Sequence, residues 1–254
     1  MDATNIPPIP EDAAFVERLD ASAVLTLGLE ALGPDRLALS ASLGPEDIVI
    51  LDLLAHLTRP RVFTLDTGRL PTATYELMDA VQDRWGVVIE RYAPETEVVE
   101  AMVRVHGLDL FYDGPELRMQ CCHVRKVLPL RRALTDVDGW VTGLRRDQTG
   151  TRAATTKISL DMDHGGVWKL APLADWTEGQ VWAHIRENDL PYNTLHDEGY
   201  RSIGCEPCTR PVGPGEHPRA GRWWWEQSDH RECGLHVTWT PGNPSTALRM
   251  LDQQ

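Results

Sequence analysis

Basic residues, and lysine above all, are scarce in this chain. It has 3 lysines against 22 arginines, and its 38 acidic residues leave a net charge of −13. Binding nucleic acid through general electrostatics needs clustered basic side chains, so we expect no nucleic-acid partner. No run approaches the roughly 20 apolar residues of a membrane span, so we expect no membrane insertion. The first residues also lack the basic start and apolar core of a secretory signal.

Cysteine is also scarce, with five in 254 residues. An odd count in a chain without a predicted export signal is not typical of a disulfide scaffold, so we expect reduced thiols and a cytoplasmic location. The length suits one large domain, and we find no internal repeat, linker or low-complexity tract. We therefore predict a single domain over residues 1–254, in which residues 237–254 form a mobile C-terminal tail.

Predicted strands and helices alternate along most of the chain. The patterns predict strands at residues 36–40, 61–65, 87–92, 139–144 and 167–170, and helices at 11–32, 46–57, 71–85, 95–105, 120–134 and 177–188. This alternation predicts an α/β fold in which helices cover both faces of a parallel sheet. After residue 190 the periodicity fades into an irregular, cysteine-rich C-terminal segment. Ligands bind such sheets at the carboxyl ends of the strands, which points to the loops at residues 40–44 and 66–68.

Four of the cysteines form two close pairs. Cys205 and Cys208 make a C-x-x-C motif, and Cys121 and Cys122 are adjacent at the start of a predicted helix. Four thiolates in two pairs suit zinc, an iron–sulfur cluster or a redox disulfide, and the spacing alone does not separate these. Alternatively, Cys121 and Cys122 are small buried hydrophobic residues and only the C-x-x-C is functional.

The fifth cysteine, Cys233, stands apart. His236 and several arginines are near it in the sequence, and such neighbours lower the pKa of a thiol and favour a nucleophilic thiolate. The alternative is an inert thiol near the end of the chain.

Three further segments have simpler interpretations. Trp223–Trp225 cannot all face one ligand, so we expect them to pack around the cysteines. Asp161 and Asp163 are typical of a solvated loop, and the polar stretch that begins at Arg145 is typical of a surface loop.

Six sequence blocks together carry a resemblance to a known family. They are TLDTGRL at 64–70, CCxxRK at 121–126, GLRRDQ at 143–148, SIGCEPCTRP at 202–211, GRWWWE at 221–226 and ECGLH at 232–236. In this order they resemble the assimilatory adenylyl-sulfate (APS) reductases of the bacterial phosphoadenylyl-sulfate (PAPS) reductase family. The resemblance covers nearly the whole chain, from about Leu37 to His236.

The resemblance implies an adenine nucleotide α-hydrolase-like reductase domain. It implies a 4Fe–4S cluster on Cys121, Cys122, Cys205 and Cys208. It also implies that Cys233 attacks the sulfur of APS, that AMP leaves, and that thioredoxin or glutaredoxin releases sulfite from the resulting S-sulfonate. This chemistry belongs to sulfate assimilation and cysteine biosynthesis. A homo-oligomer is compatible with the sequence, which does not fix the oligomeric state.

The resemblance also implies a set of substrate-binding residues. Guanidinium groups suit phosphate and sulfate because they donate two parallel hydrogen bonds. Ser40, Ser42 and Gly44 match a phosphate-binding loop, whose backbone N–H groups would face the anion. The complete set is Ser40, Ser42, Gly44, Leu65, Asp66, Gly68, Lys126, Arg152, Arg219, Arg222 and His236.

Two departures from the family pattern stand out. Residues 71–75 read PTATY, so the proline is shifted by one place and a glutamate is missing. The loop S-A-S-L-G-P-E-D at 40–47 lacks the S-G-G of related ATP pyrophosphatases, which argues against ATP activation. Three alternatives stay open: a PAPS reductase, a sulfur-inserting tRNA-modifying enzyme of the same superfamily, and a non-catalytic zinc-binding protein.

Overall fold

The computed structural model describes Ile9 and residues 12–226, which divide into two units. The first unit contains the residues up to Thr64 together with Thr72–Glu90 and Ala133–Thr194. The second contains Leu65–Pro71, Arg91–Arg132 and the residues from Leu195 onward. The prediction of one domain over residues 1–254 stays a prediction, and the predicted tail at 237–254 lies outside the described residues.

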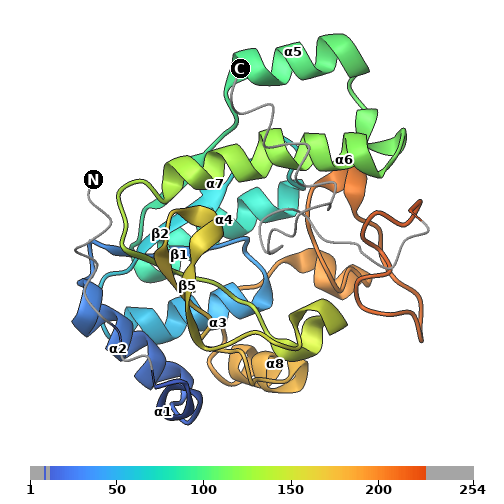
Figure 1. The fold of residues 1–254 in the computed structure, drawn as a ribbon. Helices are drawn as coiled ribbons and strands as arrows, with labels where there is room; N and C mark the ends of the chain where they lie inside the picture. The colour runs from blue at the N-terminus through green and yellow to red at the C-terminus, as the bar shows by residue number, and fades with distance from the viewer. Residues whose placement is uncertain (1–8, 10–11, 227–254) are drawn as a thin grey trace. The chain divides into compact units, whose positions relative to one another are not determined.

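The first unit is built on a six-stranded sheet with the order β3-β2-β1-β4-β6-β5. Strands β1, β2 and β5 are labelled in Figure 1. Its strands are β1 (Leu37–Ser40), β2 (Arg61–Leu65), β3 (Ile89–Tyr92), β4 (Gly139–Val141), β5 (Ile158–Asp161) and β6 (Val167–Leu170). β1 pairs in parallel with both β2 and β4, and β4 pairs in parallel with β6. The last residues of β2 and β3 lead into the second unit. The predicted α/β class with a mainly parallel sheet is confirmed.

The edge strand β5 was not predicted, and it runs antiparallel to β6. Its four residues directly follow the polar stretch that begins at Arg145, which we interpreted as a surface loop. Asp161, at its end, is buried rather than solvated. Its carboxylate accepts hydrogen bonds from Trp140 Nε1 at 3.2 Å and pairs with His164 Nδ1 at 2.9 Å. The prediction that Asp161 lies in a solvated loop is therefore wrong, because the fold buries its carboxylate against Trp140 and His164.

The strand order reverses between β1 and β4. The chain runs outward from β1 through β2 to β3, whereas β4 lies on the other side of β1 and continues to β6. Ligands of open α/β sheets bind at the carboxyl ends of the strands where the order reverses. The loop after β1 and the loop after β4 are therefore the places in this unit to look for a site.

The helices of the first unit are α1 (Ala13–Glu17), α2 (Ala21–Leu32), α3 (Pro45–Ala55), α4 (Thr72–Trp85) and α8 (Glu178–Glu187). The predicted helix at 11–32 is in fact two helices, because the Asp20 side chain accepts from Ala23 N at 2.8 Å and begins α2. Helix α3 is apolar on nearly all sides and therefore buried. It packs against α2, β1 and α8.

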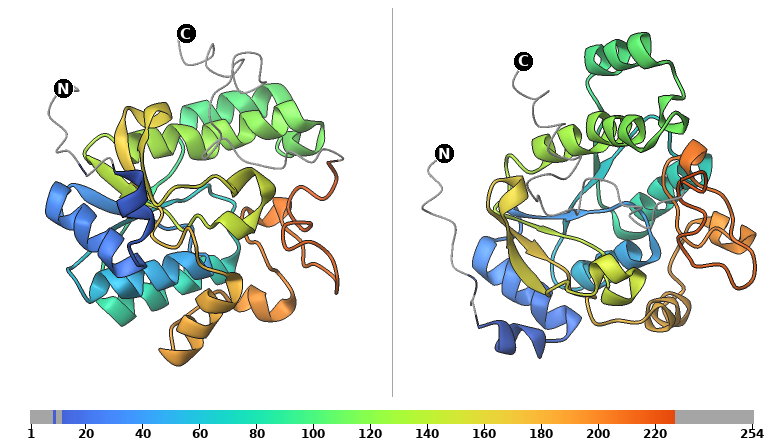
Figure 2. Two further views of the ribbon diagram at one scale, coloured as in Figure 1. Left: turned by 60° about the horizontal axis from the view of Figure 1, so that its bottom comes forward. Right: turned by 45° about the vertical axis from the view of Figure 1, so that its right-hand side comes forward.

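The second unit contains α5 (Thr96–His106), α6 (Pro115–Cys122), a π-helical segment (His123–Val127) and α7 (Leu128–Ala133). The last three run end to end (Figures 1 and 2). The sequence predicted a single helix at 120–134 that begins at the cysteine pair. Instead, Pro115 occupies the first turn of α6, a position that suits proline, and Cys121 and Cys122 end that helix.

The remaining described residues of the second unit, from Leu195 to Glu226, are mostly irregular, as predicted. They contain the 3₁₀ turn Glu206–Cys208, all but the first residue of the 3₁₀ turn Thr194–Glu198, and one antiparallel bridge between Thr209 and Arg222. The core of the unit combines Met102, Leu110, Phe111, Val124 and Trp223 with four cysteines. None of the helices in the described residues is long and apolar enough to cross a membrane.

Candidate functional site

The loop after β1 is held by the first turn of the helix that follows it. The Asp47 carboxylate of α3 accepts three hydrogen bonds on Oδ2, from Ser42 N at 2.7 Å, Ser42 Oγ at 2.8 Å and Gly44 N at 3.3 Å. Gly143, in the loop after β4, lies against this turn. A Cβ there would come within 2.6 Å of Asp47 Oδ1, so only glycine allows this approach. Two backbone N–H groups that we expected to face an anion thus donate to a carboxylate of the same chain.

Asp47 is buried, and burial raises the pKa of its carboxyl from 3.8 to about 7. The hydrogen bonds from Ser42 and Gly44 lower the pKa, whereas the charge of Glu46 raises it further. This turn therefore carries a carboxyl group that titrates near neutral pH.

Four of the predicted substrate-binding residues belong to the first unit: Ser40, Ser42, Gly44 and Arg152. Ser40 ends β1, and Ser42 and Gly44 lie in the loop just described. Arg152 follows in a 3₁₀ turn, and its Nη1 donates to Gln148 Oε1 at 2.6 Å. Arg145 is buried and donates from Nε to Glu46 Oε1 at 2.9 Å, so the stretch that begins there is not simply a surface loop.

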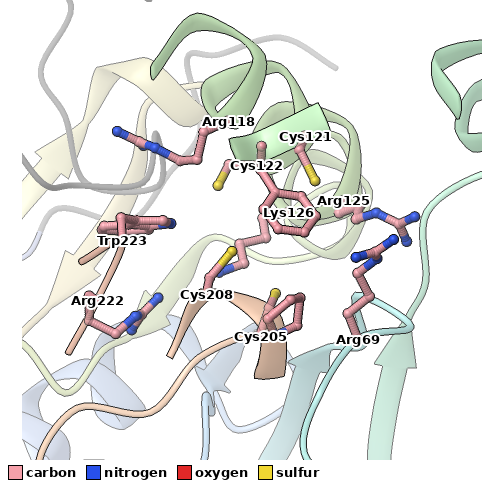
Figure 3. Close-up of a pocket in the computed structure, with 12 residues that line it drawn as sticks. Arg69, Arg118, Cys121, Cys122, Arg125, Lys126, Cys205, Cys208, Arg222 and Trp223 are labelled. Atoms are coloured by element: carbon pink, nitrogen blue, oxygen red, sulfur yellow. The ribbon is translucent and has the colours of Figure 1, made fainter. Parts of the chain in front are cut away.

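The second unit brings the two cysteine pairs into one pocket (Figure 3). Cys121 and Cys122 end α6. Cys205 precedes the 3₁₀ turn Glu206–Cys208, and Cys208 ends it and donates from its backbone N to Cys205 O at 3.0 Å. All four thiols are buried and free of disulfides. Thr67 Oγ1 lies 3.3 Å from Cys205 Sγ. The pocket holds about 370 Å³ of space between atoms, its open mouth included.

Cationic side chains surround these thiols. Arg69, Arg125, Lys126 and Arg222 all line the pocket. Burial raises the pKa of Cys208 to about 12, with Cys205 adding to the rise and the charges of Lys126 and Arg222 opposing it. Burial likewise raises the pKa of Cys121, and the charge of Arg125 opposes the rise. Without a bound cation the thiols of Cys121 and Cys208 keep their protons at neutral pH, so the site suits a metal centre that displaces these protons.

Three hydrogen-bond donors in this pocket have no acceptor within the part of the chain that the structure describes. They are Arg125 Nε, Arg222 Nε and Trp223 Nε1, and all are buried. Burying an N–H group without an acceptor costs about 1–3 kcal/mol, so such groups are rare in folded proteins. Their presence around four thiols indicates that the pocket is built to face an electron-rich group.

A buried ion pair that the sequence did not reveal lies beside the pocket. Arg118 of α6 donates from Nε and Nη2 to the two carboxylate oxygens of Glu226, at 2.8 and 3.0 Å. The two side chains are 3% and 1% exposed. The Arg118 guanidinium also stacks 4.6 Å from the Trp223 ring centre. This pair ties the cysteine-bearing helix to the end of the tryptophan run.

The other predicted residues of the second unit are spread over it. Asp66 Oδ1 accepts from Gly68 N at 3.0 Å in a tight turn that follows Leu65, and Gly68 has a φ of 67°, which favours glycine. Lys126 and Arg222 lie in the cysteine pocket, whereas Arg219 does not line it. Cys233 and His236 lie outside the described residues.

Comparison with known proteins connects these features. A sequence profile described as "Phosphoadenosine phosphosulfate reductase domain" matches residues 36–211, more than half of the chain. The chain belongs to this family. Two bacterial members named adenosine 5′-phosphosulfate reductase are each 47% identical to it. The protein of Burkholderia cepacia matches over 241 residues, 94% of each chain, and that of Allochromatium vinosum over 228 residues, 89% of each.

A solved structure of the family supports the fold. The crystal structure of phosphoadenylyl-sulfate (PAPS) reductase from Candida auris, a phosphate complex, has a TM-score of 0.66 and 28% identity, and the match covers 79% of this chain and 94% of that one. The family profile ends before Arg219, Arg222 and Cys233. The match to the Burkholderia relative covers 94% of this chain, and the part that it leaves out is shorter than the 21 residues that follow Cys233. The match therefore extends beyond this cysteine.

The pKa of Asp47 predicts a pH-dependent stability. The folded state keeps the Asp47 proton between pH 3.8 and about 7, where the unfolded chain has lost it. The stability that this proton confers is therefore lost as the pH rises toward and through 7, by up to about 1.4 kcal/mol per pH unit. Denaturant unfolding should show that the free energy of unfolding of the wild type falls, relative to that of Asp47→Asn, as the pH rises over this range. Parallel pH profiles of the two proteins would contradict this assignment.

The Arg118–Glu226 pair predicts a large loss of stability when one partner is removed. Glu226→Ala leaves the Arg118 charge buried and unpaired, and we expect the free energy of unfolding to fall by about 3–5 kcal/mol. The matched control is Glu216→Ala, which breaks the exposed pair with Arg210 and should change little. The apolar double variant Arg118→Met/Glu226→Leu should recover most of the loss. Equal losses from Glu226→Ala and Glu216→Ala would refute the role of the buried charge.

Proposed function

We propose that this protein reduces adenylyl sulfate (APS) to sulfite and AMP, with thioredoxin or glutaredoxin as the thiol reductant, in assimilatory sulfate reduction and cysteine biosynthesis. The observation that carries the proposal is the meeting of four free cysteines, from two chain segments, in one buried pocket lined by arginine and lysine. The 47% identical relatives named adenosine 5′-phosphosulfate reductase support the same activity.

We infer that the pocket holds a 4Fe–4S cluster, bound by Cys121, Cys122, Cys205 and Cys208. Four thiols are the ligand set that such clusters take, and the buried N–H groups of Arg125, Arg222 and Trp223 suit sulfur acceptors. When bound, the cluster would supply a compact charged group that links the four thiolates.

A single zinc ion fits this pocket less well than a cluster. Zinc needs all of its thiolate ligands about 2.3 Å from one centre. Structural zinc sites take cysteine pairs with about two to four residues between them, whereas Cys121 and Cys122 are adjacent. A cluster carries its ligands on separate iron atoms. The adjacent pair therefore disfavours the zinc-binding alternative.

We assign the covalent step to Cys233. Its thiolate attacks the sulfur of APS, a sulfur–sulfur bond forms, and the bond from that sulfur to the phosphate oxygen breaks, so that AMP leaves. A thiolate of the reductant then attacks the Cys233 sulfur, and sulfite leaves with the electron pair of the sulfur–sulfur bond. A second thiol of the reductant resolves the mixed disulfide and returns Cys233 to the thiol form.

Substrate binding requires cations, because a thiolate must approach a group that already carries negative charge. We assign this role to the residues that the resemblance implies: Ser40, Ser42, Gly44, Leu65, Asp66, Gly68, Lys126, Arg152, Arg219, Arg222 and His236. Lys126 lies close enough to Cys208 to lower the pKa of that thiol, which suits a residue that links the charges of cluster and substrate.

The strongest alternative substrate is PAPS, which carries an additional phosphate. The Candida auris structure bears the name of a PAPS reductase, but it is only 28% identical to this chain. The family resemblance implies that PAPS-preferring relatives generally lack the four cluster cysteines, so the presence of these cysteines favours APS. Because the function needs free thiols, we also propose a cytoplasmic location.

The cluster assignment predicts colour and composition. Protein purified without oxygen should absorb visible light and contain about four iron and four sulfide ions per chain. Cys208→Ser should lose this absorption. Cys233→Ser is the matched control, since it removes the one cysteine outside the ligand set and should keep the colour. A colourless protein that contains stoichiometric zinc would contradict the assignment.

The nucleophile assignment predicts a covalent intermediate. Mixed with APS in the absence of reductant, the protein should gain the mass of one SO₃ group, and reduced thioredoxin should remove it. Cys233→Ser should gain nothing. A parallel reaction with PAPS tests the substrate preference, and we expect a slower gain. An adduct that persists in Cys233→Ser would refute the role of Cys233, and faster reaction with PAPS would refute the preference for APS.

A further inference from the structure

Gln148 makes every hydrogen bond that its side-chain amide can make. It lies in the 3₁₀ turn Arg146–Gln148 of the segment that follows β4. Its Nε2 donates to Glu46 Oε1 at 3.0 Å and to Gly143 O at 3.2 Å. Its Oε1 accepts from Arg145 N at 3.1 Å and from Arg152 Nη1 at 2.6 Å. Two donors and two acceptors are the full capacity of a glutamine side chain.

These partners fix which way the amide points. Exchanging the oxygen and the nitrogen would bring the NH₂ group against two donors, Arg145 N and Arg152 Nη1. It would also bring the oxygen against two acceptors, on Glu46 and Gly143. Because both sides would then be mismatched, only one orientation satisfies the network. Gln148 therefore links Arg152 rigidly to the first turn of α3.

The Gln148 side chain is uncharged, and this affects the charge of Arg152, which it binds. A carboxylate at this position would pair with Arg152 and cancel the charge that an anionic substrate needs, whereas an amide orients the guanidinium and leaves its charge intact. Arg152 also lies within electrostatic range of Lys169. Burial lowers the pKa of Lys169, Asp161 raises it, the charge of Arg152 lowers it, and Asp163 raises it.

We propose that Gln148 is a positioning residue that fixes the Arg152 guanidinium for binding the anionic groups of the substrate. This inference rests on the proposed function, in which Arg152 binds APS. It assigns Gln148 no contact with the reacting atoms. The expected signature is therefore weaker substrate binding with nearly unchanged chemistry once the substrate is bound.

The test compares steady-state kinetics of holoenzyme variants with APS and reduced thioredoxin. Gln148→Leu should raise KM about tenfold, which corresponds to about 1.4 kcal/mol, and change kcat less than twofold. Gln148→Glu should raise KM further, because its carboxylate competes for Arg152. The matched control is Gln180→Leu. Gln180 accepts from Thr177 N and Oγ1 at 2.8 and 2.9 Å in the cap of α8, and its loss should leave KM unchanged.

A double-mutant cycle with Arg152→Ala separates positioning from general stability. If Gln148 acts through Arg152, then Gln148→Leu should not weaken APS binding further in the Arg152→Ala background. Equilibrium binding of APS to the same variants, made in a Cys233→Ser background, gives this coupling without turnover.

Any of three results would overturn the inference: a wild-type KM for Gln148→Leu, additive effects in the cycle, or a loss confined to kcat. A wild type that binds APS but does not reduce it would contradict the proposed function instead, and the binding cycle would still decide the role of Gln148. A wild type that does not bind APS would overturn both.

Discussion

The second unit depends on one constraint, the burial of four thiols from distant parts of the chain in a single pocket. Cys122 and Cys205 are 83 positions apart, so bringing the pairs together costs loop-closure entropy that the contacts of the pocket must offset. Phe111 and Trp223 pack around the thiols and exclude water, and this same burial raises the pKa of Cys208. A metal centre that displaces the thiol protons would convert these unfavourable features into folding free energy.

Charge is distributed unevenly between the whole chain and its pocket. The protein carries −13 overall, yet Arg69, Arg125, Lys126 and Arg222 line the cysteine pocket. Buried cations of this kind need either partners or a bound anionic group. Arg118 shows the first solution, with a fully buried carboxylate from Glu226. The Nε atoms of Arg125 and Arg222 have no acceptor among the residues that the structure describes, which suits the second solution. The net charge of the chain gives no sign of either.

In the first unit, hydrogen bonds within the chain order the loops at the end of the sheet where the strand order reverses. Asp47 accepts from backbone N–H groups of the loop after β1, and Gln148 joins Glu46 to Arg152. Both arrangements rely on Gly143, because a side chain there would collide with Asp47 and Glu46. The loop is therefore a preformed framework that also fixes Arg152 through Gln148.

The sequence by itself determined the α/β class, the bounds of β2 and β6, and the family, because buried strands and motif residues are encoded locally. The beginning of α6 and the strand β5 were missed, since α6 begins at a glycine–proline pair and β5 directly follows a polar stretch that is typical of a surface loop. The partners of the site residues depended on tertiary structure alone, even where a residue lies in one of the motifs. Glu226 lies 108 positions from Arg118, and Glu46 lies 102 positions from Gln148. No local pattern links such residues, because their pairing is created by the packing that buries them together.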